Sequence, residues 1–320
     1  MSTKQATSKT ATSLTKSSSR STHAAPTVGV IGLGIMGSAM STNLSQSGWH
    51  VLGYDTQTAT RKRMSKHISE VSSSVAEMVG PAKLFIASLP STAALIQVSQ
   101  QMADAAQKLK IKAGTVVLAE TSTLPVADKL QASTLLAQAG IEMIDAPLSG
   151  TGAQAKHKDL TVYASGPQKA VKSMAKVFAG CARDYRNVGE FGNGMKMKMV
   201  ANLLVAIHNV STAEAILFGE KLGLDPKQVV DVVGSGAGGS RMFQVRGPVM
   251  VQRNWHQATM KNEIWQKDMT IIHKALVDLC VPAPLFSACL PIYHAAMAQG
   301  HTLDDTASVY AVLERLAGGA

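Results

Sequence analysis

The chain has 320 residues, 46% of them hydrophobic, and a formal net charge of +10. This length predicts two domains, since a single hydrophobic core seldom serves more than about 250 to 300 residues. The longest apolar runs are too short or too interrupted to cross a bilayer, which takes about 20 consecutive apolar residues. We therefore expect a soluble protein with no membrane partner.

The distribution of positive charge disfavours nucleic acid as a partner. Lys4, Lys9, Lys16 and Arg20 lie in an N-terminal stretch without acidic residues, and the remaining basic residues are dispersed. Only 4% of the residues are aromatic, so no platform for stacking bases is visible. We expect no nucleic-acid binding.

The cysteines and histidines indicate no metal site. Cys181, Cys280 and Cys289 are odd in number and form no Cys-x-x-Cys pair, which is typical of reduced thiols in a cytosolic compartment. The nine histidines include no His-Glu-x-x-His motif and no cluster of two histidines with a carboxylate.

Residues 1–26 consist almost entirely of Ser, Thr, Lys, Ala and Gln. Such a segment buries too little apolar surface to offset its ordering entropy, so we predict a disordered tail. A basic, hydroxyl-rich stretch without acids also fits an organelle transit peptide, but arginine is scarce and an apolar helix face is missing. We expect a cytoplasmic protein, with an organelle matrix as the alternative.

The rest of the chain changes character near residue 190. Before that point, short apolar runs alternate with helix-compatible stretches, which predicts a doubly wound parallel sheet in an α/β domain over 27–190. The expected strands are Thr27–Ile31, His50–Asp55, Lys83–Leu89, Thr115–Ala119, Glu142–Asp145 and Leu160–Ala164. After Gly194, apolar residues recur at helical spacing without proline from Met195 to Asp225. This predicts a long helix that opens an all-helical domain over 191–320.

A Gly-x-Gly-x-x-Gly motif, Gly32-Leu33-Gly34-Ile35-Met36-Gly37, lies between the first strand and the first helix. In dinucleotide-binding domains these glycines allow a tight turn, a close approach of the backbone to a pyrophosphate and close helix–strand packing. Asp55 ends the next strand, where a carboxylate accepts hydrogen bonds from ribose hydroxyls and repels a 2′-phosphate. A turn residue is the simpler interpretation of Asp55, but the context favours NAD over NADP.

Six ordered motifs together resemble the 3-hydroxyisobutyrate dehydrogenase family, also called the β-hydroxyacid dehydrogenases. They are Gly32–Met40, Leu89-Pro90-Ser91, Glu120-Thr-Ser-Thr123, Asp145-Ala-Pro-Leu-Ser-Gly150, Gly192-Asn-Gly194 with Lys198 and Asn202, and Gln266-Lys267-Asp268-Met269. The resemblance implies a Rossmann domain, a helical domain and a long interdomain helix, with NAD as the cofactor.

The resemblance also implies roles for single residues. Lys198 would be the acid/base that takes the proton of the substrate hydroxyl, and Asn202, four residues on, would hold the substrate on the same helix face. Ser122, Ser149, Gly150 and Thr151 would bind the substrate carboxylate. Cofactor contacts are expected from Leu33, Ile35, Met36, Leu89, Pro90, Thr123 and Lys267 in addition to the three glycines and Asp55. Asp268 is expected to be a structural partner.

The sequence departs from the family at several positions. Thr151, Gln154 and Lys158 stand where the family usually has glycine, which implies a differently shaped carboxylate loop. The segments 161–166 and 240–243 look most like the L-threonate dehydrogenase branch, in which a tryptophan stands at the position of Arg241. A guanidinium there could bind a distal anionic or polar group of the substrate, or it could simply point to solvent.

We therefore expect an NAD-dependent dehydrogenase of small 3-hydroxy-carboxylic acids, such as 3-hydroxyisobutyrate, threonate or tartronate semialdehyde, acting as a homodimer or homotetramer. One alternative is an imine reductase on the same scaffold, a branch that lacks the lysine at position 198. The other is a non-catalytic interaction module that binds the cofactor, which we would expect to lose Lys198 and to gain a targeting domain.

Overall fold

The structure is a computed structural model, and it describes residues 25–318. The predicted N-terminal tail therefore lies outside the described residues, apart from Ala25 and Pro26. The first half is built on a six-stranded sheet in the order β3-β2-β1-β4-β5-β6, with all neighbouring strands parallel. The strands are β1 (Thr27–Ile31), β2 (His50–Tyr54), β3 (Glu70–Val71), β4 (Leu84–Ala87), β5 (Val116–Glu120) and β6 (Ile141–Asp145).

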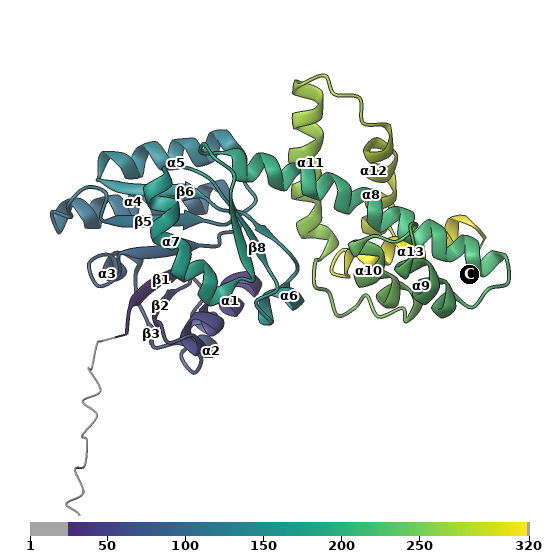
Figure 1. Ribbon diagram of the computed structural model, residues 1–320, viewed down its shortest axis with the longest axis horizontal. Coiled ribbons are helices and arrows are strands. Elements are labelled where there is room, and N and C mark those ends of the chain that lie inside the picture. The colour runs from purple at the N-terminus through teal and green to yellow at the C-terminus, as the bar shows by residue number, and fades with distance from the viewer. Residues whose placement is uncertain (1–24, 319–320) are drawn as a thin grey trace, which may run out of the picture.

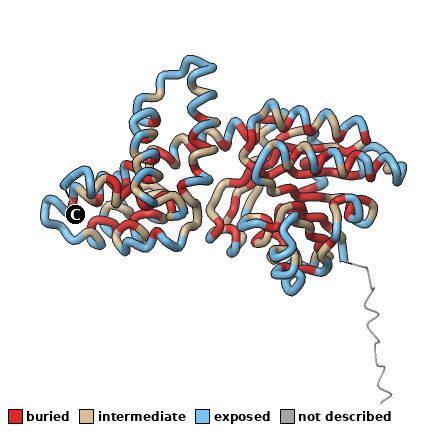
Figure 2. The backbone as a smooth tube through the Cα atoms, turned by 180° about the vertical axis from the view of Figure 1, so that it is seen from behind, coloured by how far each residue is buried: buried red, intermediate tan, exposed pale blue. Residues whose placement is uncertain are grey.

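Helices cover both faces of this sheet, which confirms the doubly wound α/β prediction (Figure 1). They are α1 (Ile35–Gln46), α2 (Thr58–Met64), α3 (Val75–Met78), α4 (Thr92–Lys108), α5 (Val126–Gln138), α6 (Gly152–Lys156) and α7 (Gln168–Cys181). Alternate strand residues feed two cores: Val28 and Val30 pack with α1 and α7, while Phe85 and Leu118 pack with α4 and α5. Figure 2 shows this buried sheet between exposed outer helix faces.

A second sheet of three strands corrects one sequence prediction. The predicted strand Leu160–Ala164 was expected to belong to the parallel sheet, but it forms β8 (Thr161–Ala164) of this separate sheet. There β8 pairs antiparallel with β7 (Leu148–Ser149) and parallel with β9 (Asp184–Asn187). The reason is that the chain leaves β6 through β7 and turns at α6, so β8 returns antiparallel beside β7. Only Ser165, which follows β8, forms an isolated antiparallel bridge with Asp145 at the end of β6.

From Asn193 onward the described residues contain helices and no strand. The helices are α8 (Asn193–Lys221), α9 (Pro226–Ser235), α10 (Arg241–Val251), α11 (Asn262–Asp278), α12 (Pro284–Ala298), the 3-10 turn η1 (Thr306–Ser308) and α13 (Val309–Leu316). The predicted long helix is α8, which runs from the sheet-containing half through the helical half (Figure 1). Helices α10, α11, α12 and α13 pack against it.

Helix α8 is long and apolar enough, by length and composition alone, to cross a membrane, which the interrupted apolar runs of the sequence did not indicate. Its 29 residues include an 18-residue window with a mean hydropathy of 1.4, and 39% of that window is buried. The helix carries Lys198, Asn202 and Asn209 on its buried side, where Asn202 and Asn209 hydrogen-bond to polar groups of other elements. These contacts fit the core helix of a folded domain.

Candidate functional site

The glycine-rich turn between β1 and α1 has the geometry needed to hold a dinucleotide phosphate. Gly32 adopts a φ of +87°, and a Cβ on Gly37 would lie 1.8 Å from the carbonyl oxygen of Gly32. No side chain caps α1, and its N-cap is Gly34. The first N–H groups of the helix are thus available to an anion, which also favours the positive end of the helix dipole.

Asp55 lies directly beside this turn, at the end of β2. One carboxylate oxygen accepts the Leu33 N–H at 2.8 Å, and the other accepts the Gln57 N–H at 2.8 Å. A carboxylate offers about four lone-pair sites, so these two bonds fix its orientation and leave room for ribose hydroxyls. The arrangement fits the predicted cofactor role of Asp55.

Asp55 also lines a groove of about 740 Å³ between the two halves of the molecule. The groove is bordered by the glycine turn, by α2, by α6 and by the loop before α11; its lining includes Gly34, Ile35, Gln57, Arg63, Gly152, Lys156 and Thr259. The cations Arg63 and Lys156 were not among the predicted site residues. Other predicted residues, among them Ser122 and Lys198, do not line this groove.

The predicted carboxylate loop leads into α6, and Thr151 has a local role there. Its hydroxyl accepts the Gln154 N–H at 3.4 Å, and its own N–H donates to Gln154 Oε1 at 3.0 Å. This capping box occupies the Thr151 N–H that was expected to bind substrate. Gly150 has a φ of +133°, and Lys158 adopts a φ of +58° where the family usually has glycine.

Ser122 follows the end of β5 and is 7% exposed. Its hydroxyl oxygen accepts the Leu89 N–H at 2.7 Å, so the predicted Ser-Thr loop and the Leu89-Pro90 loop are joined. The hydroxyl proton is not committed by this bond and can be donated. Thr123 and Pro90 adjoin the same junction.

The predicted catalytic residues lie on the buried side of α8. Lys198 is 9% exposed and Asn202 is 4% exposed, one turn further on. Asn202 donates a hydrogen bond of 2.8 Å to the Asp268 carboxylate on α11, next to Lys267. The structure therefore brings together Lys198, Asn202, Lys267 and Asp268 from motifs far apart in the sequence.

The electrostatics of this cluster favour a lysine that can exchange a proton. Burial and the neighbouring Lys267 lower the pKa of Lys198 below its usual value, and Asp268 opposes them. Burial raises the pKa of the Asp268 carboxyl, while Lys198, Lys267 and the hydrogen bond from Asn202 act against that rise. A lysine with a lowered pKa is partly neutral closer to neutral pH, as a general base requires.

Two family profiles match this chain over overlapping stretches. Residues 27–212 match the NAD-binding domain of 6-phosphogluconate dehydrogenase, and residues 192–313 match a profile described as the NAD-binding domain of NADP-dependent 3-hydroxyisobutyrate dehydrogenase. The L-threonate dehydrogenase of Escherichia coli K12 is 30% identical, over 88% of this chain and 93% of that relative. The chain belongs to the 3-hydroxyisobutyrate dehydrogenase family.

Other relatives agree with this membership. The 2-(hydroxymethyl)glutarate dehydrogenase of Eubacterium barkeri is 25% identical over 91% of this chain and 96% of its own length. The crystal structure of Mycobacterium tuberculosis 3-hydroxyisobutyrate dehydrogenase with L-serine superposes with a TM-score of 0.78 at 25% identity, covering 91% and 99% of the two chains. The protein is a nicotinamide-dependent hydroxyacid dehydrogenase by family. The imine reductase alternative receives less support, since a Myxococcus stipitatus imine reductase shares 17% identity at a TM-score of 0.55.

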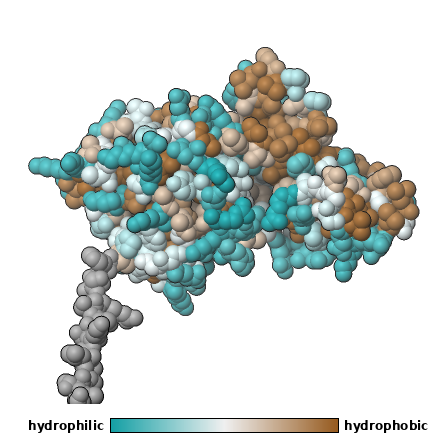
Figure 3. Space-filling model, viewed as in Figure 1, coloured by the Kyte–Doolittle hydropathy of each residue, from teal (hydrophilic) through white to brown (hydrophobic). Residues whose placement is uncertain are grey.

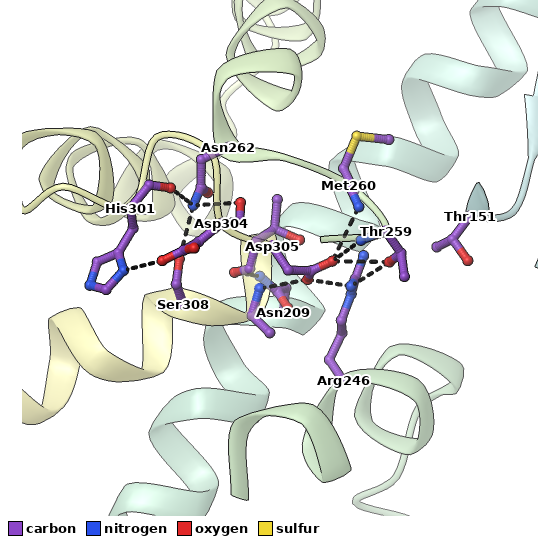
Figure 4. Close-up of polar contacts among 12 residues, drawn as sticks. Thr151, Asn209, Arg246, Thr259, Met260, Asn262, His301, Asp304, Asp305 and Ser308 are labelled. Atoms are coloured by element: carbon purple, nitrogen blue, oxygen red, sulfur yellow. Dashed lines mark hydrogen bonds and ion pairs between the residues drawn. The ribbon is translucent and has the colours of Figure 1, made fainter. Parts of the chain in front are cut away.

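The loop before α11, which borders the groove of this dehydrogenase, is fixed by a buried network that the sequence analysis missed. Asp305 accepts the N–H groups of Thr259 and Met260 at 2.8 and 3.1 Å, and it pairs with Arg246 (Figure 4). The Arg246 and Asp305 side chains are 3% and 2% exposed. In Figure 4 Thr259 lies between this network and Thr151, so the network sets the position of the helical side of the groove.

Arg241 is the first residue of α10, and its guanidinium lies 3.6 Å from the Asp159 carboxylate of the first half. The two side chains are 68% and 27% exposed. Gln154 also donates to Asp159, at 3.0 Å. Arg241 thus faces the α6 region across the boundary between the two halves, and its ion pair is open to solvent.

Three more residues with buried charges were not predicted as site residues: Glu120, Lys129 and Asp145, all 0% exposed. The Lys129 ammonium lies 2.7 Å from each of the two carboxylates. Glu120 and Asp145 occur in the motifs that carried the resemblance, but Lys129 does not. No local signal distinguishes it from a surface lysine of α5.

Proposed function

We propose that this protein transfers a hydride between NAD and a small 3-hydroxy-carboxylic acid, with Lys198 as the acid/base. The observation that carries the proposal is the buried Lys198, whose pKa is lowered by burial and by Lys267, beside the Asn202–Asp268 hydrogen bond. The glycine-rich turn and the uncapped N-terminus of α1 support the same proposal, because they would bind the dinucleotide cofactor that a dehydrogenase needs.

The reaction requires transfer of a hydride and of a proton, which we assign to different groups. A bound nicotinamide supplies the hydride acceptor or donor. Neutral Lys198 accepts the proton of the substrate hydroxyl during oxidation, and its ammonium form returns a proton to the oxygen during reduction. Asn202, held by Asp268, offers its amide to the substrate on the same helix face.

We infer that the substrate carboxylate is bound by the Ser122 hydroxyl and by the Ser149-Gly150 segment. The Ser122 oxygen already accepts the Leu89 N–H, which leaves its proton to be donated to an anion. The Thr151 N–H already donates to Gln154 in the cap of α6, so it is the weakest of the predicted carboxylate ligands. Thr123, Pro90 and Lys267 remain proposed cofactor contacts.

NAD is the proposed coenzyme because Asp55 presents its carboxylate to the groove where the adenosine ribose is expected. The groove also contains Arg63 and Lys156, which could offset part of the repulsion toward a 2′-phosphate. The preference for NAD is therefore proposed on Asp55 and on the backbone bonds that orient it.

The substrate class is proposed from chemistry shared by the relatives. Their names specify L-threonate, 2-(hydroxymethyl)glutarate and 3-hydroxyisobutyrate, all of them hydroxy-carboxylates. The test is the initial rate of NAD reduction by the full chain over a panel of these acids, with 2-hydroxybutyrate as the isomeric 2-hydroxy control for 3-hydroxyisobutyrate. Oxidation of none of them, with reduction of cyclic imines instead, would contradict the proposal.

We further propose a cytoplasmic homodimer or homotetramer. Large apolar side chains are exposed on the helical half, where Phe218 is 67% exposed, Leu222 62% and Leu285 66%. Figure 3 shows apolar residues gathered over the α11–α12 arm, while polar residues dominate the sheet-containing half. Contiguous apolar patches of this kind usually mark an interface, and light scattering coupled to gel filtration would measure the assembly.

A further inference from the structure

We propose that Lys129 is a positioning residue for the reaction, because it ties the first turn of α8, and with it Lys198, to the loop that carries Ser122. The inference rests on the proposed function in that it takes Lys198 to be the acid/base. Lys129 contributes no atom to the groove and is buried under the site.

Lys129 projects from α5 between the carboxyl ends of two neighbouring strands. Its ammonium lies 2.7 Å from Glu120 Oε2, at the end of β5, and 2.7 Å from Asp145 Oδ1, at the end of β6. All three side chains are 0% exposed. The two carboxylates raise the pKa of Lys129 despite the opposing effect of its burial, so the lysine stays charged.

Asp145 also binds the first turn of α8, the helix that carries Lys198. Its second oxygen accepts the Met195 N–H at 2.7 Å, and the Ser165 hydroxyl, 3.2 Å away, accepts the Gly194 N–H at 2.9 Å. A Cβ on Gly194 would lie 2.9 Å from the same Asp145 oxygen. The backbone of α8 is therefore in close contact with Asp145 at Met195, which lies three residues before Lys198.

Glu120 binds the loop that carries Ser122. Its Oε1 accepts the Ser122 N–H at 2.9 Å, and the Ser122 hydroxyl in turn accepts the Leu89 N–H at 2.7 Å. A continuous chain of polar contacts thus runs from the proposed carboxylate ligand, through Lys129, to the start of the helix that carries Lys198.

The charge balance explains why a lysine is needed at this point. Without it, Glu120 and Asp145 would be two like charges buried at adjacent strand ends with no counter-ion, an arrangement that costs free energy. Asp145 alone keeps favourable contacts, because it faces the positive end of the α8 dipole. A buried ion pair is in itself weak evidence for a gain in stability. This one connects the Ser122 loop to the start of α8.

The test compares Lys129→Met with two further variants. Ser165→Ala removes only the hydroxyl that accepts the Gly194 N–H, so it loosens the α8 cap more gently and should fold. Val177→Ala, a fully buried position on α7, is the control for lost stability elsewhere. Steady-state kinetics and hydrogen exchange of residues 193–199 are measured well below each melting temperature.

We expect kcat to fall by about 10- to 100-fold in Lys129→Met and less in Ser165→Ala, since small misplacements of reacting groups cost factors of this size. The KM for NAD should change little, and exchange at 193–199 should speed up in both variants but not in Val177→Ala. Values of kcat within twofold of the Val177→Ala control in every variant that folds would overturn the inference. A wild-type chain with no turnover would instead contradict the proposed function, and exchange at 193–199 would then decide whether Lys129 fixes α8.

Discussion

Asn202 on α8 and Asp268 on α11 are joined by a buried hydrogen bond of 2.8 Å. This bond connects the helix that carries the proposed acid/base to the late Lys-Asp motif, 66 residues away in the sequence. It also places a carboxylate in the electrostatic surroundings of Lys198, where Lys267 acts in the opposite sense.

Lys198→Ala should lower kcat by about 10² to 10⁴, because general acid/base catalysis contributes a factor of that order. Binding of NAD, followed by fluorescence quenching, should be retained. The matched control is Lys196→Ala, since Lys196 is exposed and contacts Asn193 at 3.1 Å. A Lys198→Ala enzyme that keeps more than about a tenth of wild-type turnover would remove Lys198 from this role.

Asp268→Asn should shift the pH dependence of alcohol oxidation. Oxidation requires neutral Lys198, so kcat/KM rises as the pH passes the pKa of Lys198. The Asp268 carboxylate raises that pKa, and its removal lowers it. The rising limb should therefore move to lower pH. Asparagine keeps the shape and an oxygen for Asn202, which limits other effects.

Lys267→Met should shift the same pH dependence in the opposite direction. Lys267 lowers the pKa of Lys198, so its removal should move the rising limb to higher pH. A higher KM for NAD is also expected if Lys267 contacts the cofactor. Limbs that move in the same direction in both variants, or that do not move, would mean that another group limits oxidation.

Five strands of the main sheet were predictable because they are short apolar runs separated by glycine turns and helices, whereas the two-residue edge strand β3 was not predicted. The strands β7 and β9 were not predicted: Leu148–Ser149 has two residues, and Asp184-Tyr-Arg-Asn187 is mostly polar. Neither carries the apolar run by which a buried strand is recognised. Their pairing comes from the path of the chain around α6, which local sequence does not encode.

The site was predictable where a motif specifies the backbone, and not where tertiary contacts decide. Lys129 resembles any lysine of an amphipathic helix, and only the fold brings Glu120 and Asp145 to its ammonium. The cap at Thr151, in contrast, was readable, because Thr151-Gly-Ala-Gln154 has the spacing of a capping box.

Asp55→Asn should relax the discrimination between coenzymes. The Asp55 carboxylate is oriented by the Leu33 and Gln57 N–H groups, and asparagine can keep one of these bonds while losing the charge. The ratio of kcat/KM for NADP to that for NAD should rise about tenfold or more, since an unfavourable charge contact is removed near Arg63 and Lys156. A clear preference for NADP in the wild type would contradict the assignment.

Removal of residues 1–24 should leave turnover and melting temperature nearly unchanged, since a sequence made mostly of Ser, Thr, Lys, Ala and Gln offers little apolar surface to bury. Removal of residues 1–26 should cost more, because the Pro26 carbonyl accepts the His50 N–H at 3.0 Å beside β1 and β2. We expect about 0.5 to 1.5 kcal/mol for that bond. Denaturant unfolding of the two truncated proteins measures the difference, and equal stabilities would assign Pro26 no role.

Arg241 offers a test of substrate specificity. Its guanidinium is 3.6 Å from Asp159 and largely exposed, so it can either hold the two halves together or turn toward a second anionic group of a bound substrate. The second role would suit a dicarboxylate such as the substrate that names the Eubacterium barkeri relative. Hydroxy acids with a polar or charged tail should then be oxidised better than 3-hydroxyisobutyrate.

The variants Arg241→Trp and Asp159→Asn separate these roles. If Arg241 binds the substrate tail, Arg241→Trp should shift relative kcat/KM toward small neutral-tailed acids by about 1 to 3 kcal/mol. Asp159→Asn releases the guanidinium, so it should preserve or strengthen the preference for charged tails. If the ion pair only joins the two halves, both variants should change kcat/KM by the same factor for every acid. An unchanged substrate profile in Arg241→Trp would assign specificity to the loop around Gly150 and Thr151, where the capped start of α6 already differs from the glycines usual in the family.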